Sequence, residues 1–190
     1  MAETLGESPL QMQSVVIAYM LTVALLIPAS GWLADRFGTR RIYLAAILLF
    51  TLGSLACAAA NTLPMLVAAR VLQGVGGALL MPIGRLAVLR VYSKHELLRV
   101  MSFVTIPGLV GPLIGPALGG WLVEVASWHW VFLINLPVGI LGFIASWYFM
   151  PDLRQGTATF DWQGFVVFSA GMVLVSVGLQ GLGEHSISTG

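Results

Sequence analysis

The chain has 190 residues, of which 58% are hydrophobic and only 9% are charged, and its mean hydropathy is +0.92. Soluble domains carry about 25% charged residues, so this chain cannot cover a globular surface with polar groups and is predicted to be an all-α polytopic membrane protein. A spanning helix takes about 20 apolar residues, which leaves no room for an ATPase domain within this length. The formal net charge of +1 says nothing about partners; the lipid bilayer is the expected environment, and no nucleic-acid partner is expected.

Six apolar stretches of about 20 residues are predicted to be membrane-spanning helices. They cover residues 15–34, 42–60, 65–84, 100–123, 130–150 and 164–182. Residues 1–150 would form an incomplete five-helix unit, and residues 151–190 a short cytoplasmic loop with one further helix. Glycine is frequent, at 22 residues, and most of the nine prolines fall within the stretches. Because small residues let helices approach closely and neighbours satisfy carbonyls freed at proline, we expect a tightly packed, kinked bundle.

The basic residues lie in alternate connections between the predicted spans. Eight of the nine follow the first, third and fifth spans, and the connections on the opposite side contain none. The eight are Arg36, Arg40, Arg41, Arg85, Arg90, Lys94, Arg99 and Arg154. By the positive-inside rule these three connections are cytoplasmic, so both ends of the chain are predicted to face outward.

The connection after the first span has the pattern G-x-L-A-D-R-x-G-x-R-R. Its defining residues are Gly31, Asp35, Arg36, Gly38, Arg40 and Arg41. Gly31 is expected where helices touch, Gly38 permits a tight reversal through positive φ, and Asp35 is expected to form a charge cluster with the neighbouring arginines. The same residues also fit an ordinary cytoplasmic turn with snorkelling arginines.

Arg70 is a charged residue inside the third predicted span. A guanidinium is costly to bury in the bilayer, so it normally faces the bundle interior and has a partner. Gln73, Gly74, Gly77 and Met81 share its helical face. Arg70 and Gln73 are therefore candidates for a functional polar site, and a structural arginine that caps neighbouring carbonyls is the alternative. The glycines do not form a nucleotide loop, because a third Gly and a preceding strand are missing.

The fourth predicted span carries Gly and Pro at four-residue intervals, so one side of the helix is almost bare of side chains. This face includes Gly111, Pro112, Gly115, Pro116, Gly119 and Gly120. Such a surface permits close contact with another helix, and its prolines fix bends. On packing grounds alone it fits any association face made of small residues.

Together these patterns resemble the major facilitator superfamily. The 31–41 pattern is similar to its loop between transmembrane helices 2 and 3, the Arg70 face to its helix 4, and G-x-x-x-G-P-x-x-G-G at 111–120 to the helix 5 signature of its antiporters. W-x-W-x-F-x-I-N-x-P-x-G at 128–139 and the short connection before the last span resemble the drug:H+ antiporter family with 14 helices. Ser102 and His129 depart from the family patterns at their edges.

The resemblance implies part of a proton-coupled multidrug efflux antiporter of the bacterial inner membrane, which exports lipophilic or cationic small molecules. The 31–41 loop would gate conformational changes, Arg70 and Gln73 would belong to the proton-coupling network, and the 111–120 face would bend the helix that lines the cavity. The partners implied are a drug-like substrate and protons, with no cofactor and no metal.

In this register the six spans correspond to family helices 2 to 7. A helix 1 and a second half are then expected to complete the transporter, because facilitators alternate access between two halves. The predicted spans contain no carboxylate, so the proton-carrying acid would come from those missing helices. The alternatives are a non-transporting truncated membrane protein or a helix-binding scaffold. An intramembrane serine protease is not expected, because Ser30 and His129 would lie at opposite membrane faces, and the chain is predicted not to be an enzyme.

Overall fold

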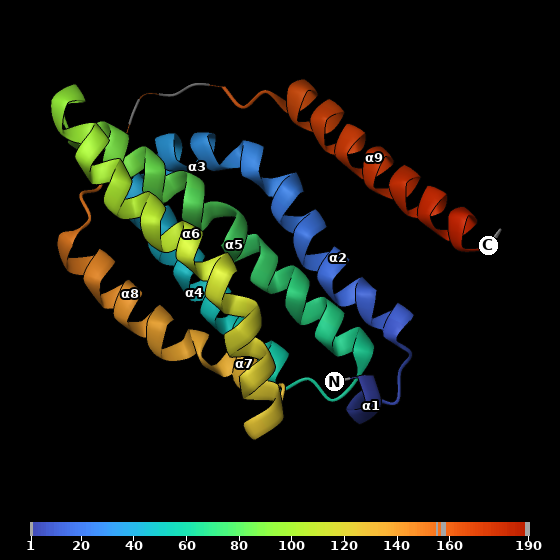
Figure 1. Ribbon diagram of the computed structural model, residues 1–190. Coiled ribbons are helices and arrows are strands. Elements are labelled where there is room, and N and C mark those ends of the chain that lie inside the picture. Colours follow the sequence, from blue (N-terminus) through green and yellow to red (C-terminus); the bar gives the residue numbers. More distant parts are fainter. Residues whose placement is uncertain (1, 155, 157–158, 189–190) are drawn as a thin grey trace.

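The computed structural model describes residues 2–154, 156 and 159–188, and these are almost entirely helical, with no strand among them (Figure 1). The elements are α1 (Ala2–Leu5), α2 (Pro9–Leu26), the 3₁₀ turn η1 (Ile27–Ala29), α3 (Ser30–Phe37), α4 (Thr39–Ala58), α5 (Leu63–Val91), α6 (Lys94–Val125), α7 (Trp130–Leu133), α8 (Asn135–Phe149) and α9 (Trp162–Ser188). The predicted all-α fold is confirmed.

Five helical segments are long and apolar enough to cross a membrane, and they coincide with the first five predicted spans. They are Leu10–Phe37, Thr39–Ala58, Leu63–Val91, Lys94–Val125 and Trp130–Phe149. The sixth predicted stretch falls in α9, whose described apolar part is Trp162–Val175. The first span contains the predicted kind of proline irregularity, since Pro28 lies in the 3₁₀ turn that separates α2 from α3.

The connection between the third and fourth spans is much shorter than the sequence suggests. Arg85 and Arg90 were expected in it but lie in α5, and Lys94 and Arg99 lie in α6. Only residues 92–93 join the two helices. Helix α6 starts early because Ser93 forms a capping box with Glu96, the third residue of the helix: the Ser93 backbone N–H donates to the Glu96 carboxylate at 3.2 Å.

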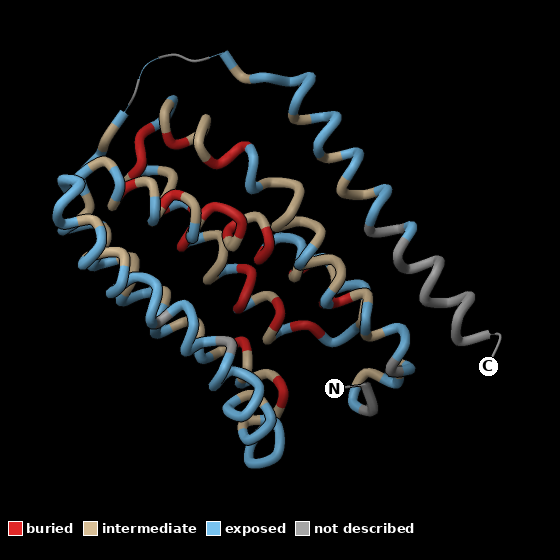
Figure 2. Tube along the Cα trace, turned by 45° about the horizontal axis from the view of Figure 1, so that its top comes forward, coloured by how far each residue is buried: buried red, intermediate tan, exposed pale blue. Residues whose placement is uncertain are grey.

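The core of the bundle lies along α4 and α5, where most buried residues gather (Figure 2). A Cβ at Gly53 of α4 would lie 2.6 Å from the backbone N of Gln73 in α5. On the other face of α5, a Cβ at Gly74 would lie 2.8 Å from the Cβ of Thr22 in α2. Helix α5 therefore packs between α2 and α4 with the helix backbones in close approach, as expected where small residues line a helix contact in a membrane bundle.

Helix α6 departs from the expectation of tight packing. None of its residues with a described side chain is buried, although the helix contacts α5 and α7. A Cβ at any of the glycines of the small-residue face would meet no described atom within 4 Å; these are Gly108, Gly111, Gly115, Gly119 and Gly120. Pro116 is exposed, and the side chain of Pro112 lies outside the described residues. Within the described part of the chain, no other helix packs closely against these glycines.

Candidate functional site

The side chain of Arg70 lies at the junction of α2, α5 and α7. Its Nε–H donates to the backbone oxygen of Val15 at 3.3 Å, and Nη1 donates to Oε1 of Gln73 at 2.8 Å. The guanidinium carbon lies 4.4 Å from the ring centre of Tyr19 and 5.7 Å from that of Phe132. Two aromatic rings and two oxygens therefore stabilise a cation that would be costly to leave bare in the bilayer.

Gln73 extends the network into α4 and α8. Its side chain is 2% exposed, and Nε2 donates to Oγ of Ser54 at 2.7 Å. The Ser54 hydroxyl donates to the backbone oxygen of Phe50 at 2.9 Å and accepts from Nδ2 of Asn135 at 3.3 Å. The predicted pair of Arg70 and Gln73 is thus part of a polar chain through four helices.

Tyr19, Ser54 and Asn135 were not identified as site residues from the sequence, although Asn135 lies in a quoted motif. The available signal was their polarity within apolar runs, because hydrogen-bonding side chains in spanning helices tend to join one helix to another. That signal does not say which polar residues meet, since the three lie on three different helices.

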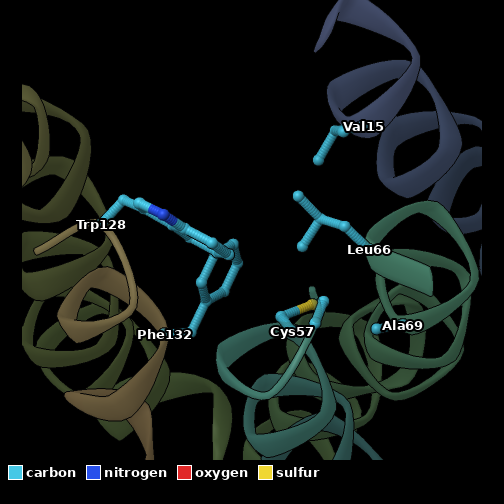
Figure 3. Close-up of a cluster of buried hydrophobic side chains, with 7 residues drawn as sticks. Val15, Cys57, Leu66, Ala69, Trp128 and Phe132 are labelled. Atoms are coloured by element: carbon cyan, nitrogen blue, oxygen red, sulfur yellow. The ribbon is translucent and has the colours of Figure 1, made fainter. Parts of the chain in front are cut away.

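An apolar cluster covers the network at the α7 end of the bundle (Figure 3). The side chains of Trp128 and Phe132 reach toward Cys57 and Leu66, and all four are at most 6% exposed. The sulfur of Cys57 lies 3.9 Å from Oε1 of Gln73. Because this surrounding is apolar, the hydrogen bonds of Gln73 act in a medium of low dielectric constant, where they are stronger than in water.

The helical face predicted around Arg70 divides between two neighbours. A Cβ at Gly77 would lie 2.8 Å from the hydroxyl of Tyr19, and Gly74 also faces α2, whereas Gln73 faces α4. Met81 takes part in neither contact and is 58% exposed. Four of the five residues of the predicted face therefore lie at these helix contacts, and Met81 does not.

The turn between α3 and α4 is the second candidate region, and it consists of Gly38 alone, at φ +100°. The expected cluster of Asp35 with its neighbouring arginines is wrong: the carboxylate of Asp35 is paired with Nη2 of Arg90, from α5. Helix α3 directs Asp35 toward α5, because the two helices are in contact there. The Arg90 side chain is only 9% exposed, so the pair ties α3 to α5.

The other arginines of this region have partners of different kinds. The guanidinium carbon of Arg36 lies 5.5 Å from the Trp32 ring, and that of Arg40 lies 5.8 Å from the Trp147 ring. Nε of Arg41 lies 3.6 Å from a carboxylate oxygen of Asp152. The contact of Arg36 lies within α3, whereas Arg40 and Arg41 connect the start of α4 with α8 and with the segment after it.

Gly31 does not mediate the helix contact expected of it. A Cβ at this position would meet no described atom within 4 Å, and Gly31 instead borders a cavity of about 560 Å³ between α3 and the start of α9. Thr39, in contrast, is fully buried: its hydroxyl donates to the Pro151 oxygen at 3.1 Å and accepts from the Leu153 N–H at 3.0 Å. The segment after α8 is therefore held against the first turn of α4.

The family model described as Major Facilitator Superfamily matches residues 1–163. The chain belongs to the major facilitator superfamily. This confirms the resemblance inferred from the motifs and makes the chain a multi-pass membrane protein. Among the described residues, no cluster of His, Cys, Asp or Glu could hold a metal ion.

Several curated relatives share the name "Putative multidrug resistance protein MdtD". The chain is 57% identical to that of Enterobacter sp. (strain 638) over 189 residues, and the alignment covers 100% of this chain and 40% of the relative. It is 57% identical to that of Klebsiella pneumoniae subsp. pneumoniae over 181 residues, with 95% and 38% covered. The chain thus spans about two fifths of the length of these relatives.

Among solved structures, a crystal structure of a mutant of the peptide transporter POT in complex with sulfate superimposes with a TM-score of 0.71. The match covers 93% of this chain and 38% of that one, at 21% sequence identity. It shows that this chain has the fold of the matched part of that transporter.

Proposed function

We propose that the chain is part of a proton-coupled multidrug efflux antiporter that exports lipophilic or cationic small molecules across the bacterial inner membrane. The observation that carries the proposal is the partly buried Arg70, held by Gln73 and by two aromatic rings inside a facilitator bundle. The relatives named as multidrug resistance proteins support the choice of substrate class. Because the chain spans about two fifths of their length, the activity belongs to the complete transporter.

Arg70 supplies a fixed positive charge in this mechanism. Arginine stays protonated in proteins, so it cannot carry the proton itself. Its guanidinium has five N–H donors, and the described residues engage two of its nitrogens, Nε and Nη1. The remaining donors can bind a carboxylate from elsewhere in the transporter, whose proton affinity falls beside the cation. Protonation of that acid weakens the attraction, which gives substrate exchange a dependence on protons.

The cytoplasmic contacts supply the conformational part of the mechanism. The pair of Asp35 and Arg90 joins α3 to α5, and Thr39 joins α4 to the segment after α8. We place these basic helix ends on the cytoplasmic side, in accord with the positive-inside rule. When the transporter changes between its alternating states, these contacts either persist together or break together. The 31–41 segment is therefore suited to gate the conformational change.

The small-residue face at 111–120 contributes to the conformational change through α6. Its glycines offer a surface without side chains, against which a further helix of the complete transporter can pack closely. We assign to it the bending of α6, the helix expected to line the substrate cavity of the complete transporter. Residues 1–150 then form the incomplete N-terminal bundle, and α9 begins the helical connection that follows it.

The test is reconstitution of the protein encoded by the complete reading frame in proteoliposomes, with ethidium as the lipophilic cation. We expect ethidium movement to require an imposed pH gradient and to be lost in Arg70→Ala. The control is Arg99→Ala, since Arg99 is an exposed arginine of α6. Ethidium movement that is indifferent both to the gradient and to Arg70→Ala would overturn the coupling role. No movement by the complete protein would favour the non-transporting alternative.

A further inference from the structure

The amide of Gln73 has only one orientation that satisfies its neighbours. Oε1 accepts from Nη1 of Arg70, and Nε2 donates to the hydroxyl of Ser54. If the amide were turned over, its NH₂ group would face the guanidinium, donor against donor. Because the side chain is 2% exposed, water could not compensate for the mismatch. The orientation of this amide thus decides whether Arg70 has its oxygen partner.

Ser54 enforces that orientation because all its hydrogen-bonding capacity is used. A hydroxyl has one donor and two acceptor sites. The Ser54 hydroxyl donates to the Phe50 oxygen one turn earlier, and it accepts from Gln73 and from Nδ2 of Asn135. The hydrogen of Ser54 is occupied and its side chain is fully buried. Toward Gln73, the hydroxyl therefore acts as an acceptor and not as a donor.

Asn135 connects this arrangement to the break between α7 and α8. It is the first residue of α8, and Ile134 alone separates that helix from α7. The preceding turn of α4 also packs against α8, because a Cβ at Gly139 would lie 3.2 Å from the Cβ of Thr51. The position of α8 is thereby linked to Arg70 through Ser54 and Gln73.

We propose that Ser54 and Asn135 are positioning residues for Arg70: they hold the Gln73 amide in the orientation that fixes the guanidinium, and they link that guanidinium to α8. The proposal rests on the proposed function for its consequence in transport. The proposal also predicts that Ser54 and Arg70 are energetically coupled through Gln73, which bonds to both. This coupling can be measured without a transport assay.

The first experiment is a double-mutant cycle on thermal stability of the complete protein in detergent, with Ser54→Ala and Arg70→Ala alone and together. Residues of one hydrogen-bonded network give non-additive effects, so the double variant is expected to melt higher than the sum of the single shifts predicts. The matched control is Thr51→Val, because the Thr51 hydroxyl also donates to a carbonyl one turn earlier, at 2.8 Å, but has no bond to Gln73. Additive shifts in both cycles would overturn the proposal.

The second experiment measures ethidium exchange against pH in proteoliposomes. Ser54→Ala and Asn135→Leu are expected to lower the exchange rate about tenfold and to change its pH profile. Ser54→Ala removes the acceptor of the Gln73 amide, and Asn135→Leu removes the bond that joins Ser54 to α8. Thr51→Val should leave the profile unchanged. If Ser54→Ala does not fold, Asn135→Leu serves in both experiments. An unchanged profile with a non-additive cycle would refute the consequence for transport, and absence of ethidium exchange in the parent would refute the proposed function alone.

Discussion

Replacing Gly53 by alanine tests how tightly α4 and α5 pack beside the arginine network. A Cβ at this position would lie 2.6 Å from the backbone N and Cα of Gln73 and 2.8 Å from its Cβ. Favourable contacts between carbon atoms are about 3.5–4.0 Å long. The two helix backbones would therefore have to separate by about 1 Å.

Two opposing contributions decide the outcome of Gly53→Ala. Alanine favours the helical state over glycine by about 1 kcal/mol, whereas overpacking of a core costs about 1–3 kcal/mol. The upper part of that range applies, because the obstructing atoms belong to the backbone of Gln73 and cannot rotate away. Separation of the helices also stretches the 2.7 Å bond from Gln73 to Ser54, which contributes about 0.5–1.5 kcal/mol. We expect a net loss of about 2 kcal/mol in the free energy of unfolding.

The assay is thermal unfolding of the complete protein in detergent, followed by tryptophan fluorescence. Gly142→Ala is the matched control, because a Cβ at this position of α8 would meet no described atom within 4 Å. The control is expected to melt at or slightly above the parent temperature, and Gly53→Ala several degrees below it. If Gly53→Ala melts as high as the control, the backbone-close contact between α4 and α5 is not a stabilising feature of the bundle.

Three further predictions concern the turn between α3 and α4 and the contacts around it. Asp35→Asn leaves the nearly buried guanidinium of Arg90 without its charged partner. It should lower the free energy of unfolding by about 3 kcal/mol, near the lower end of the range for a broken buried pair. The double variant with Arg90→Gln should melt higher than Asp35→Asn, and a lower melting temperature would contradict the assigned pairing. Thr39→Val removes the hydroxyl that accepts from the Leu153 amide, so hydrogen exchange of that amide should accelerate about tenfold for a bond worth about 1.4 kcal/mol, and unchanged exchange would refute the contact. Gly38→Ala forces a Cβ into a backbone at φ +100° and should lower the unfolding free energy by at least about 1 kcal/mol in chemical denaturation; equal stability would show that the turn relaxes freely.

The register of the spans could be predicted from the sequence, while the ends of the helices could not. Apolar stretches mark where a helix crosses the bilayer, but they do not show how far it continues beyond it. Arg85 and Arg90 lie inside α5 because the chain has no Gly or Pro between Arg85 and Tyr92, the first residue after that helix. A basic residue is a good helix former, so its charge is not a signal for a loop.

The sequence by itself determined that this is a membrane-spanning helical protein, that Arg70 requires partners, and that it resembles the facilitators. These conclusions depend on composition and on spacing along one helix, which a single chain displays directly. The tertiary structure decided which partners are used: Asp35 pairs with Arg90 rather than with its neighbours, and Gln73 is fixed by Ser54. The physical reason is that a side chain in the bilayer takes its partner from whichever helix is adjacent, and adjacency is set by packing between residues far apart in the sequence.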